Sequence, residues 1–226
     1  MNIKNQTESV MSAIQKLIDG NLRFQRGLRS VEHFPTPSRL KQLSIEGQKP
    51  FCVILSCADS RVPSEMIFDQ GLGDLFVLRV AGNVVAPSLL ASLEFAVTRF
   101  GTPLVVVMGH SKCGAVQATL DHALRPTAIP TQNLEDLLSR IMPAVRTQLN
   151  LNPSHENLVD LCGIENVYST AVRIYEDSPV VQKLISTGSL SIVPAFFCLD
   201  SGKVEFEPSL PNSSQNRQAP DRDKSP

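Results

Sequence analysis

Apolar residues follow two kinds of pattern along this chain. Residues 51–57 (FCVILSC) and 104–110 (LVVVMGH) are continuous apolar runs flanked by turn residues, a pattern typical of strands buried on both faces of a parallel sheet. Residues 8–25 repeat apolar side chains at helical spacing, which predicts an amphipathic helix. Residues 74–83 predict a shorter strand, and 88–101 predict a helix closed by a glycine. The order strand, helix, strand predicts right-handed crossovers and an α/β fold.

The second half of the chain predicts further helices and a terminal strand pair. Helices are expected over residues 114–124, 134–149 and 155–176, and Pro143 should kink or divide the second of them. Residues 189–208 predict two strands that turn around the tripeptide DSG.

These elements predict one domain over residues 1–210: a central, mostly parallel β-sheet flanked by helices, with an N-terminal helical arm at 8–25. The polar, proline-rich segment 29–50 is expected to be irregular, with one short helix. Residues 211–226 carry almost no apolar side chain, and we expect this C-terminal tail to be disordered.

Composition narrows the function classes. The 226 residues are 42% hydrophobic with a formal charge of −1, so there is no basic excess, and nucleic acid is not an expected partner. No apolar run approaches the ~20 residues of a membrane span, and the first ten residues lack an export signal. We therefore expect a cytoplasmic protein whose five cysteines are free thiols or metal ligands.

Three potential metal ligands follow the two predicted buried strands. Cys57 ends one strand, His110 ends the other, and Cys113 comes three residues later, before a predicted helix. The carboxyl ends of parallel strands are where functional groups gather. Two thiolates and one imidazole suit zinc and leave a fourth position open, as in catalytic sites. A buried cysteine and a chance H-x-x-C turn would look the same, so spacing alone leaves the metal site open.

Asp59 and Arg61 strengthen the metal hypothesis. The carboxylate can fill the fourth zinc position or accept a hydrogen bond from bound water, and the arginine can hold it bidentately. A plain surface ion pair is the alternative interpretation. A cysteine-based phosphatase also pairs Cys with Arg, but it needs a longer loop than the three residues that separate Cys57 from Arg61.

The motifs around Cys57 and His110 resemble those of a known family. The heptapeptide CADSRVP, followed some fifty residues later by GHSKCGAV, is similar to the β-class carbonic anhydrases. The resemblance spans roughly residues 8–207. It also includes the segments FDQGLGDLFVLRVAGN, SLEFAV, GSLSIV and LDSGKVEF, in the family's order.

The resemblance implies an enzyme, a metal and a substrate. Cys57, His110 and Cys113 correspond to the ligands of one Zn²⁺ per chain, and Asp59 and Arg61 correspond to the catalytic dyad. The implied reaction is the reversible hydration of CO₂ to bicarbonate and a proton through zinc-bound hydroxide, which zinc supplies by lowering the pKa of water from ~15.7 towards ~7. Two thiolates make the zinc a weaker Lewis acid than three imidazoles would, so we expect activity to rise above neutral pH.

The resemblance also implies a substrate pocket. Gln48 matches a glutamine that binds substrate from across the subunit interface, although by itself it would be an ordinary loop residue. Phe76, Ala81 and Phe95 match the apolar wall of the CO₂ pocket, and Phe95 replaces a tyrosine found in many members. Gly114 can offer its backbone N–H at a helix N-terminus.

One departure concerns regulation. Some members have a second bicarbonate site, built from a Trp–Arg–Tyr cluster, that moves the aspartate onto zinc. Here Arg79 matches the arginine, but Ile54 and Phe197 stand at the other two positions and supply no hydrogen-bond donor. We expect this chain to lack that switch.

The family resemblance further implies a homodimer or a dimer of dimers, with the N-terminal helix reaching over the partner. Three rival functions stay open. They are a hydrolase of the same fold acting on COS or CS₂, a structural zinc protein without catalysis, and a nucleotide-binding α/β protein. The last has no support from a phosphate-binding glycine motif.

Overall fold

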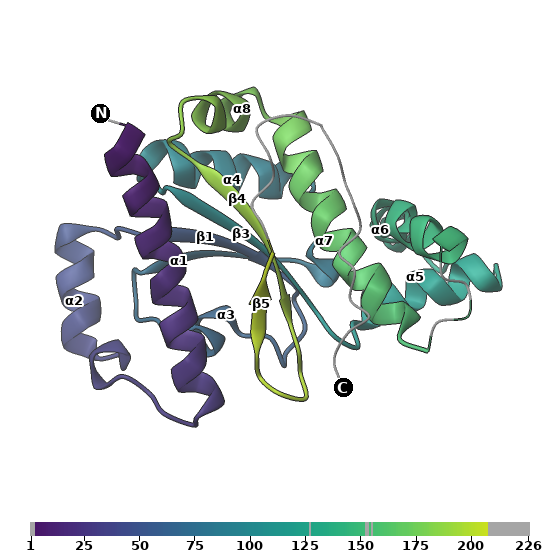
Figure 1. The fold of residues 1–226 in the computed structure, drawn as a ribbon, viewed down its shortest axis with the longest axis horizontal. Helices are drawn as coiled ribbons and strands as arrows, with labels where there is room; N and C mark the ends of the chain where they lie inside the picture. Colours follow the sequence, from purple (N-terminus) through teal and green to yellow (C-terminus); the bar gives the residue numbers. More distant parts are fainter. Residues whose placement is uncertain (1–2, 127, 152–153, 155, 208–226) are drawn as a thin grey trace.

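The computed structural model describes residues 3–126, 128–151, 154 and 156–207, so the predicted disorder of residues 211–226 lies outside the described residues. Its centre is a five-stranded sheet in the order β2-β1-β3-β4-β5 (Figure 1). The first four strands are parallel and β5 is antiparallel to β4. The strands are β1 (Cys52–Ser56), β2 (Leu75–Arg79), β3 (Leu104–His110), β4 (Ser191–Phe197) and β5 (Val204–Phe206). The predicted mostly parallel sheet flanked by helices is confirmed.

Helices connect and cover the strands. They are α1 (Ile3–Gln25), α2 (Pro37–Glu46), α3 (Ser64–Ile67), α4 (Pro87–Arg99), α5 (Gly114–Leu124), α6 (Gln132–Leu151), α7 (Leu158–Asp177) and α8 (Pro179–Ser186), with the 3₁₀ turns η1 (Val31–His33) and η2 (Ala81–Asn83). α5 has the predicted bounds, and α2 is the short helix expected between residues 29 and 50. α3 and α8 were not predicted. α8 does carry a start signal, because Ser178 caps it and Pro179 occupies its first position.

Pro143 does not divide α6, contrary to one of the two outcomes predicted for it. The helix runs unbroken from Gln132 to Leu151. Its buried face includes Ile141 and Val145, on either side of the proline, and both pack into one apolar cluster. Packing of that face therefore outweighs the helix-breaking tendency of the proline.

The sheet has helices on both faces, which makes three layers (Figure 1). α1 packs through Val10, Ala13 and Leu17 on the face that carries Ile54 and Val106. α4, α7 and α8 pack on the opposite face, which carries the alternate side chains of the same strands, such as Val53, Val105 and Ile192. Every residue of β1 and β3 is buried, because both faces of these central strands are covered.

The N-terminal arm lies on the sheet of its own chain. Asn21 of α1 is buried and joins the arm to the β4–β5 turn and to β5. Its side-chain amide donates to the Gly202 carbonyl at 2.9 Å, and its Oδ1 accepts the Val204 N–H at 2.9 Å. The contacts of α1 with this sheet therefore do not require a second chain.

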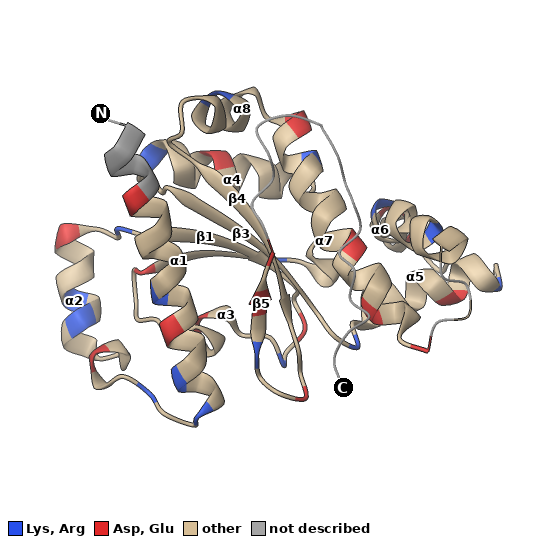
Figure 2. Ribbon diagram, viewed as in Figure 1, with Lys and Arg blue, Asp and Glu red and all other residues tan. Residues whose placement is uncertain are grey.

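α5, α6 and the start of α7 build a further apolar cluster beside the carboxyl ends of the strands. Cys57 and Cys113 belong to it, together with Ile141 and Cys162. Figure 2 shows acidic and basic residues interspersed along the helices, whereas β1, β3 and β4 are without charged residues. No helix in the described part of the chain combines the length and apolar character needed to cross a membrane.

Candidate metal centre

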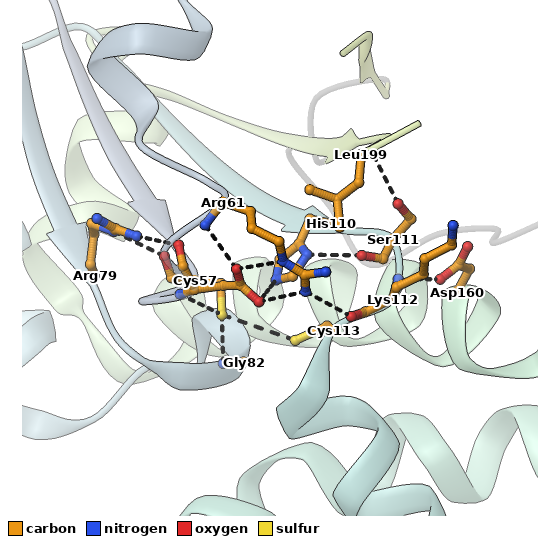
Figure 3. A network of polar contacts seen from close by, with 11 residues as sticks. Cys57, Arg61, Arg79, Gly82, His110, Ser111, Lys112, Cys113, Asp160 and Leu199 are labelled. Carbon is orange, nitrogen blue, oxygen red and sulfur yellow. Dashed lines mark hydrogen bonds and ion pairs between the residues drawn. The ribbon is translucent and has the colours of Figure 1, made fainter. Parts of the chain in front are cut away.

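Three side chains converge where neighbouring strands end. Cys57 directly follows β1, His110 is the last residue of β3, and Cys113 is the N-cap of α5. β1 and β3 are adjacent and parallel, so their carboxyl ends lie at the same edge of the sheet (Figure 3). Among the described residues, these three form the one group of potential metal ligands whose donor atoms all lie within 4.8 Å of one another.

The spacing of this group fits zinc. The two sulfur atoms are 4.0 Å apart. A tetrahedral zinc ion with Zn–S bonds of ~2.3 Å requires sulfur atoms about 3.8 Å apart. All three side chains are buried, and two soft thiolates with one imidazole are a donor set that selects zinc over hard cations. The residues present therefore fit a zinc ion with three protein ligands.

The histidine ring is oriented for metal binding. Its Nδ1 lies 2.9 Å from the Ser111 carbonyl oxygen, which can only accept, so Nδ1 carries the proton. Nε2 is then the bare acceptor nitrogen, and it is buried without a hydrogen-bond partner. Such a backbone contact fixes the tautomer of a metal-ligating histidine. The orphaned Nε2 is the strongest local indication that an ion belongs here.

Each of the two thiols shifts the pKa of the other. The hydrogen bond from Cys113 lowers the pKa of Cys57, and the N–H groups of Asp59 and Gly82 add to this effect at 3.4 Å and 3.3 Å from the sulfur. The same contact, together with burial, raises the pKa of Cys113. These contacts favour the thiolate at Cys57 over Cys113, and a bound cation would favour release of the second proton.

Asp59 faces the ligand group but is held by arginine. Arg61 Nε donates to Asp59 Oδ1 at 2.9 Å and Arg61 Nη2 donates to Oδ2 at 2.8 Å, while the Arg61 backbone N–H also reaches Oδ1 at 2.9 Å. These hydrogen bonds hold the pKa of Asp59 well below its usual range, and partial burial opposes them. Asp59 Oδ2 lies 4.0 Å from His110 Nε2. The carboxylate therefore stands beside the metal position, ionised and outside the ligand set.

The comparisons with known proteins agree with this geometry. The family model described as carbonic anhydrase matches residues 52–204, which includes all three ligands and the Asp59–Arg61 pair. Carbonic anhydrase 2 of Mycobacterium tuberculosis (strain CDC 1551 / Oshkosh) is 37% identical over 207 residues, which cover 89% of this chain and 95% of that protein. The chain belongs to the β-class carbonic anhydrase family.

Solved structures of β-carbonic anhydrases share the fold. The β-carbonic anhydrase CcaA is 27% identical to this chain, with a TM-score of 0.68, and the match covers 85% of this chain and 94% of CcaA. A β-carbonic anhydrase of Sordaria macrospora, 24% identical, matches with a TM-score of 0.67 over 76% of this chain and 86% of its own. The predicted family and fold are confirmed.

The carbonic anhydrase fold brings only some of the predicted pocket residues to the metal position. Gly114 directly follows Cys113 at the start of α5. Ala81 lies in η2, next to Gly82, whose N–H donates to Cys57 Sγ at 3.3 Å. These two positions adjoin the ligand group, and their part in binding substrate stays a prediction.

Gln48, Phe76 and Phe95 lie elsewhere in the same chain. Gln48 is exposed just before β1, at the edge of the sheet opposite the ligands. Phe76 is opposite Val53 in the strand register, near the start of β1. It forms an aromatic cluster with Phe95 and Phe100, with ring centroids 5.7–6.5 Å apart. Phe95 is 54% exposed. Within one chain these residues do not line the metal position.

Sequence reasoning missed several residues that support the carbonic anhydrase site. Gly82 has a φ of +65°, and a side chain there would meet Ile141 Cδ1 at 2.6 Å. Buried Asn166 of α7 donates to the Gly82 carbonyl at 2.7 Å. Asp160 of α7 accepts the Lys112 N–H at 2.8 Å. The tripeptide AGN after a strand was a visible turn signal, whereas nothing in the sequence linked α7 to the site.

Proposed function

We propose that this chain is a carbonate dehydratase that hydrates CO₂ reversibly to bicarbonate and a proton, with one Zn²⁺ held by Cys57, His110 and Cys113. The observation that carries the proposal is the ionised Asp59 carboxylate, held by Arg61 beside a ligand group that leaves a fourth position open. A purely structural zinc site closes that position with a fourth cysteine or histidine. An open site with a positioned carboxylate therefore favours catalysis.

When bound here, zinc would lower the pKa of a water ligand towards ~7 and so supply hydroxide at neutral pH. Asp59 Oδ2, beside the metal position, would accept a hydrogen bond from that water-derived ligand and orient it towards CO₂. Arg61 lowers the pKa of Asp59 further and orients the ionised carboxylate, which accepts and does not donate. The Gly114 N–H, at the N-terminus of α5, favours the negative charge that develops as bicarbonate forms.

In some family members a second bicarbonate site drives the movement of the aspartate onto zinc, and two of its three residues are replaced in this chain. Ile54 and Phe197 are buried in one apolar cluster, so neither offers a donor to an anion. The guanidinium of Arg79 donates hydrogen bonds to two backbone carbonyls, those of Cys57 and Asp59. These contacts support our proposal that Asp59 stays with Arg61 at neutral pH and leaves the fourth zinc position to water.

Stopped-flow CO₂ hydration at about pH 7 and about pH 8.5, with zinc measured on the same sample, tests the function. We expect one zinc per chain and activity at both pH values, rising with pH. Zinc with activity only at the higher pH would contradict the open site. Zinc without hydration at either pH would contradict the substrate, and sulfide release from COS or CS₂ would then identify the rival hydrolase.

We also propose that the enzyme is a homodimer or a dimer of dimers whose sites are completed across the subunit interface. Gln48, Phe76 and Phe95 match family pocket residues but lie away from the metal position of their own chain, and Phe95 is exposed. In a dimer, these residues would lie at the metal position of the partner chain. The Sordaria macrospora relatives in fold are tetrameric, which is compatible with dimers of dimers.

Mixed dimers test this arrangement directly. A Cys113→Ala chain lacks a metal ligand, and a Gln48→Ala chain lacks only the residue expected from across the interface. If Gln48 acts across the interface, each mixed dimer contains one complete site, and equal random mixing restores about one quarter of the wild-type hydration rate. If Gln48 acts within its own chain, mixing gives no more than the mean of the two parents.

A further inference from the structure

The two ligands of the β3–α5 connection are separated by a strained turn. Between His110 and Cys113, Lys112 has a φ of +56°, in the left-handed region that side-chain-bearing residues seldom adopt. Such a conformation is energetically unfavourable and persists only where surrounding contacts enforce it. The turn that sets the direction of Cys113 therefore depends on groups outside itself.

Both peptide groups of Lys112 are held by side chains (Figure 3). Its N–H donates to Asp160 Oδ1 at 2.8 Å, and its carbonyl accepts from Arg61 Nη2 at 3.3 Å. The second of these bonds joins the turn to the dyad, since the same Arg61 nitrogen also donates to Asp59 at 2.8 Å. A shift of the Lys112 peptide would thus disturb Cys113 and the support of Asp59 together.

The preceding residue is anchored on the backbone of β4 and its following turn. The Ser111 N–H donates to the Phe197 carbonyl at 2.9 Å, and Ser111 Oγ accepts the Leu199 N–H at 2.9 Å. These contacts fix the start of the turn but not its left-handed residue. Asp160 is the side chain that engages the N–H of Lys112, so its role is distinct from theirs.

Asp160 is well placed to act as a rigid support. It lies in the first turn of α7, where the helix dipole favours a carboxylate. The helix is anchored in the core through residues such as Val167 and Ile174. The same helix supplies buried Asn166, whose amide holds the Gly82 carbonyl, while the Gly82 N–H donates to Cys57 Sγ. α7 thus supports the backbone next to both thiols: Asn166 acts through Gly82 on Cys57, and Asp160 acts through Lys112 on Cys113.

We propose that Asp160 is a positioning residue of the metal centre. By accepting the Lys112 N–H it holds the left-handed turn, and through that turn it sets the position of Cys113 and of the Arg61 guanidinium. The proposal rests on the metal-binding part of the proposed function, and it does not depend on which small molecule the site hydrates.

A hydrogen-bond role and a charge role for Asp160 make different predictions. Asp160→Asn removes the charge but keeps an oxygen that can accept the Lys112 N–H, whereas Asp160→Ala removes both. Glu176→Ala is the matched control, because Glu176 is an exposed acidic residue on the same helix, far from the turn. If Asp160 acted only by stabilising the helix N-terminus, the Asn and Ala variants would be impaired alike.

The experiment measures zinc release from the loaded full-length protein to an excess of chelator, and hydrogen exchange of the peptide that contains Lys112 in the same proteins. We expect release to be roughly 10- to 100-fold faster in Asp160→Ala, the range typical of lost support behind a metal ligand. Faster exchange at the Lys112 amide should accompany it. Asp160→Asn and Glu176→Ala should stay within about threefold of the unchanged protein in both measurements.

Two results would overturn the proposal: equal acceleration in the Asn and Ala variants, or unchanged release in Asp160→Ala. The exchange measurement keeps the test decisive if Asp160→Ala loads zinc poorly, because the Lys112 amide can be followed without metal. A protein with the expected release pattern but no CO₂ hydration would retain this proposal and lose the proposed substrate.

Discussion

Replacing Cys113 with alanine is expected to abolish stoichiometric zinc binding and to lower CO₂ hydration by roughly three orders of magnitude or more, because hydroxide at neutral pH depends on the metal. The sulfur of Cys113 lies 4.0 Å from that of Cys57, and both belong to the one three-ligand group of the described residues. With one of the three protein ligands removed, the remaining two are too few to hold the ion stoichiometrically. Metal analysis and stopped-flow hydration on the same sample measure both effects.

Cys162→Ala provides the matched control. Cys162 is as buried as Cys113 and packs in the same apolar cluster, but it lies outside the ligand group. Its loss should lower the free energy of unfolding by about 1 kcal/mol and leave zinc content and hydration unchanged. Full zinc binding by Cys113→Ala, or zinc loss in Cys162→Ala alone, would show that the ligand set is misassigned.

Asp59→Asn is expected to lower kcat/KM for CO₂ hydration by roughly 10²- to 10⁴-fold while zinc stays bound, the range typical of a positioned acid–base group. The amide keeps the shape of the carboxylate, but its nitrogen cannot accept a proton or a hydrogen bond. Arg61→Ala should lower the rate in the same direction, because Asp59 would lose the bidentate contact that orients it. Initial rates with zinc content determined in parallel measure the loss.

Arg61 could affect either the orientation or the ionisation of Asp59, and measurements at different pH values separate these two effects. Arg61 depresses the pKa of Asp59, and without Arg61 that pKa should return upward towards ~3.9. Asp59 is ionised at pH 7 in either case, so a defect of Arg61→Ala at neutral pH reports orientation. A depressed pKa stabilises the fold above the ordinary carboxyl pKa, and this stabilisation is lost as pH falls through the folded value. The stability difference between the unchanged protein and Asp59→Asn should therefore shrink in acid.

Asp136→Asn is the control for the second prediction. Asp136 also makes a bidentate contact with an arginine, Arg140, four residues later on α6, but the pair lies outside the ligand group. Hydration should be unchanged in this variant. Wild-type activity of Asp59→Asn, or an equal defect in Asp136→Asn, would remove the catalytic role from the Asp59–Arg61 pair.

The sequence alone predicted the fold class and the meeting of the candidate ligands, for a physical reason. The apolar runs at 51–57 and 104–110 are typical of strands covered on both faces, and parallel strands place their carboxyl ends together. Cys57 and His110 end these runs, and because β1 and β3 are neighbours they lie close together in the structure. The spacing left zinc as one of two interpretations, and the resemblance of CADSRVP and GHSKCGAV to a family decided between them.

Local sequence patterns predicted secondary structure less well where tertiary packing outweighs the helix propensity of single residues. Pro143 left the division of α6 as one expected outcome, but the apolar face on both sides of it keeps the helix undivided. α8 went unpredicted because its eight residues are too few for a clear helical period. The family resemblance implied a pocket role for Phe76 and Phe95, and the single chain gathers them with Phe100 at a distance from the metal position.

Only the tertiary structure identified the groups that hold the ligands in place. Asp160 is 48 residues from Lys112, and Asn166 is 84 residues from Gly82, so no local spacing could pair them. These contacts exist because α7 packs along β3 and β4 on one face of the sheet, a position set by packing of its apolar face. The ligands could be predicted because strand ends have a fixed geometry, whereas their supports come from whichever helix the core places against them.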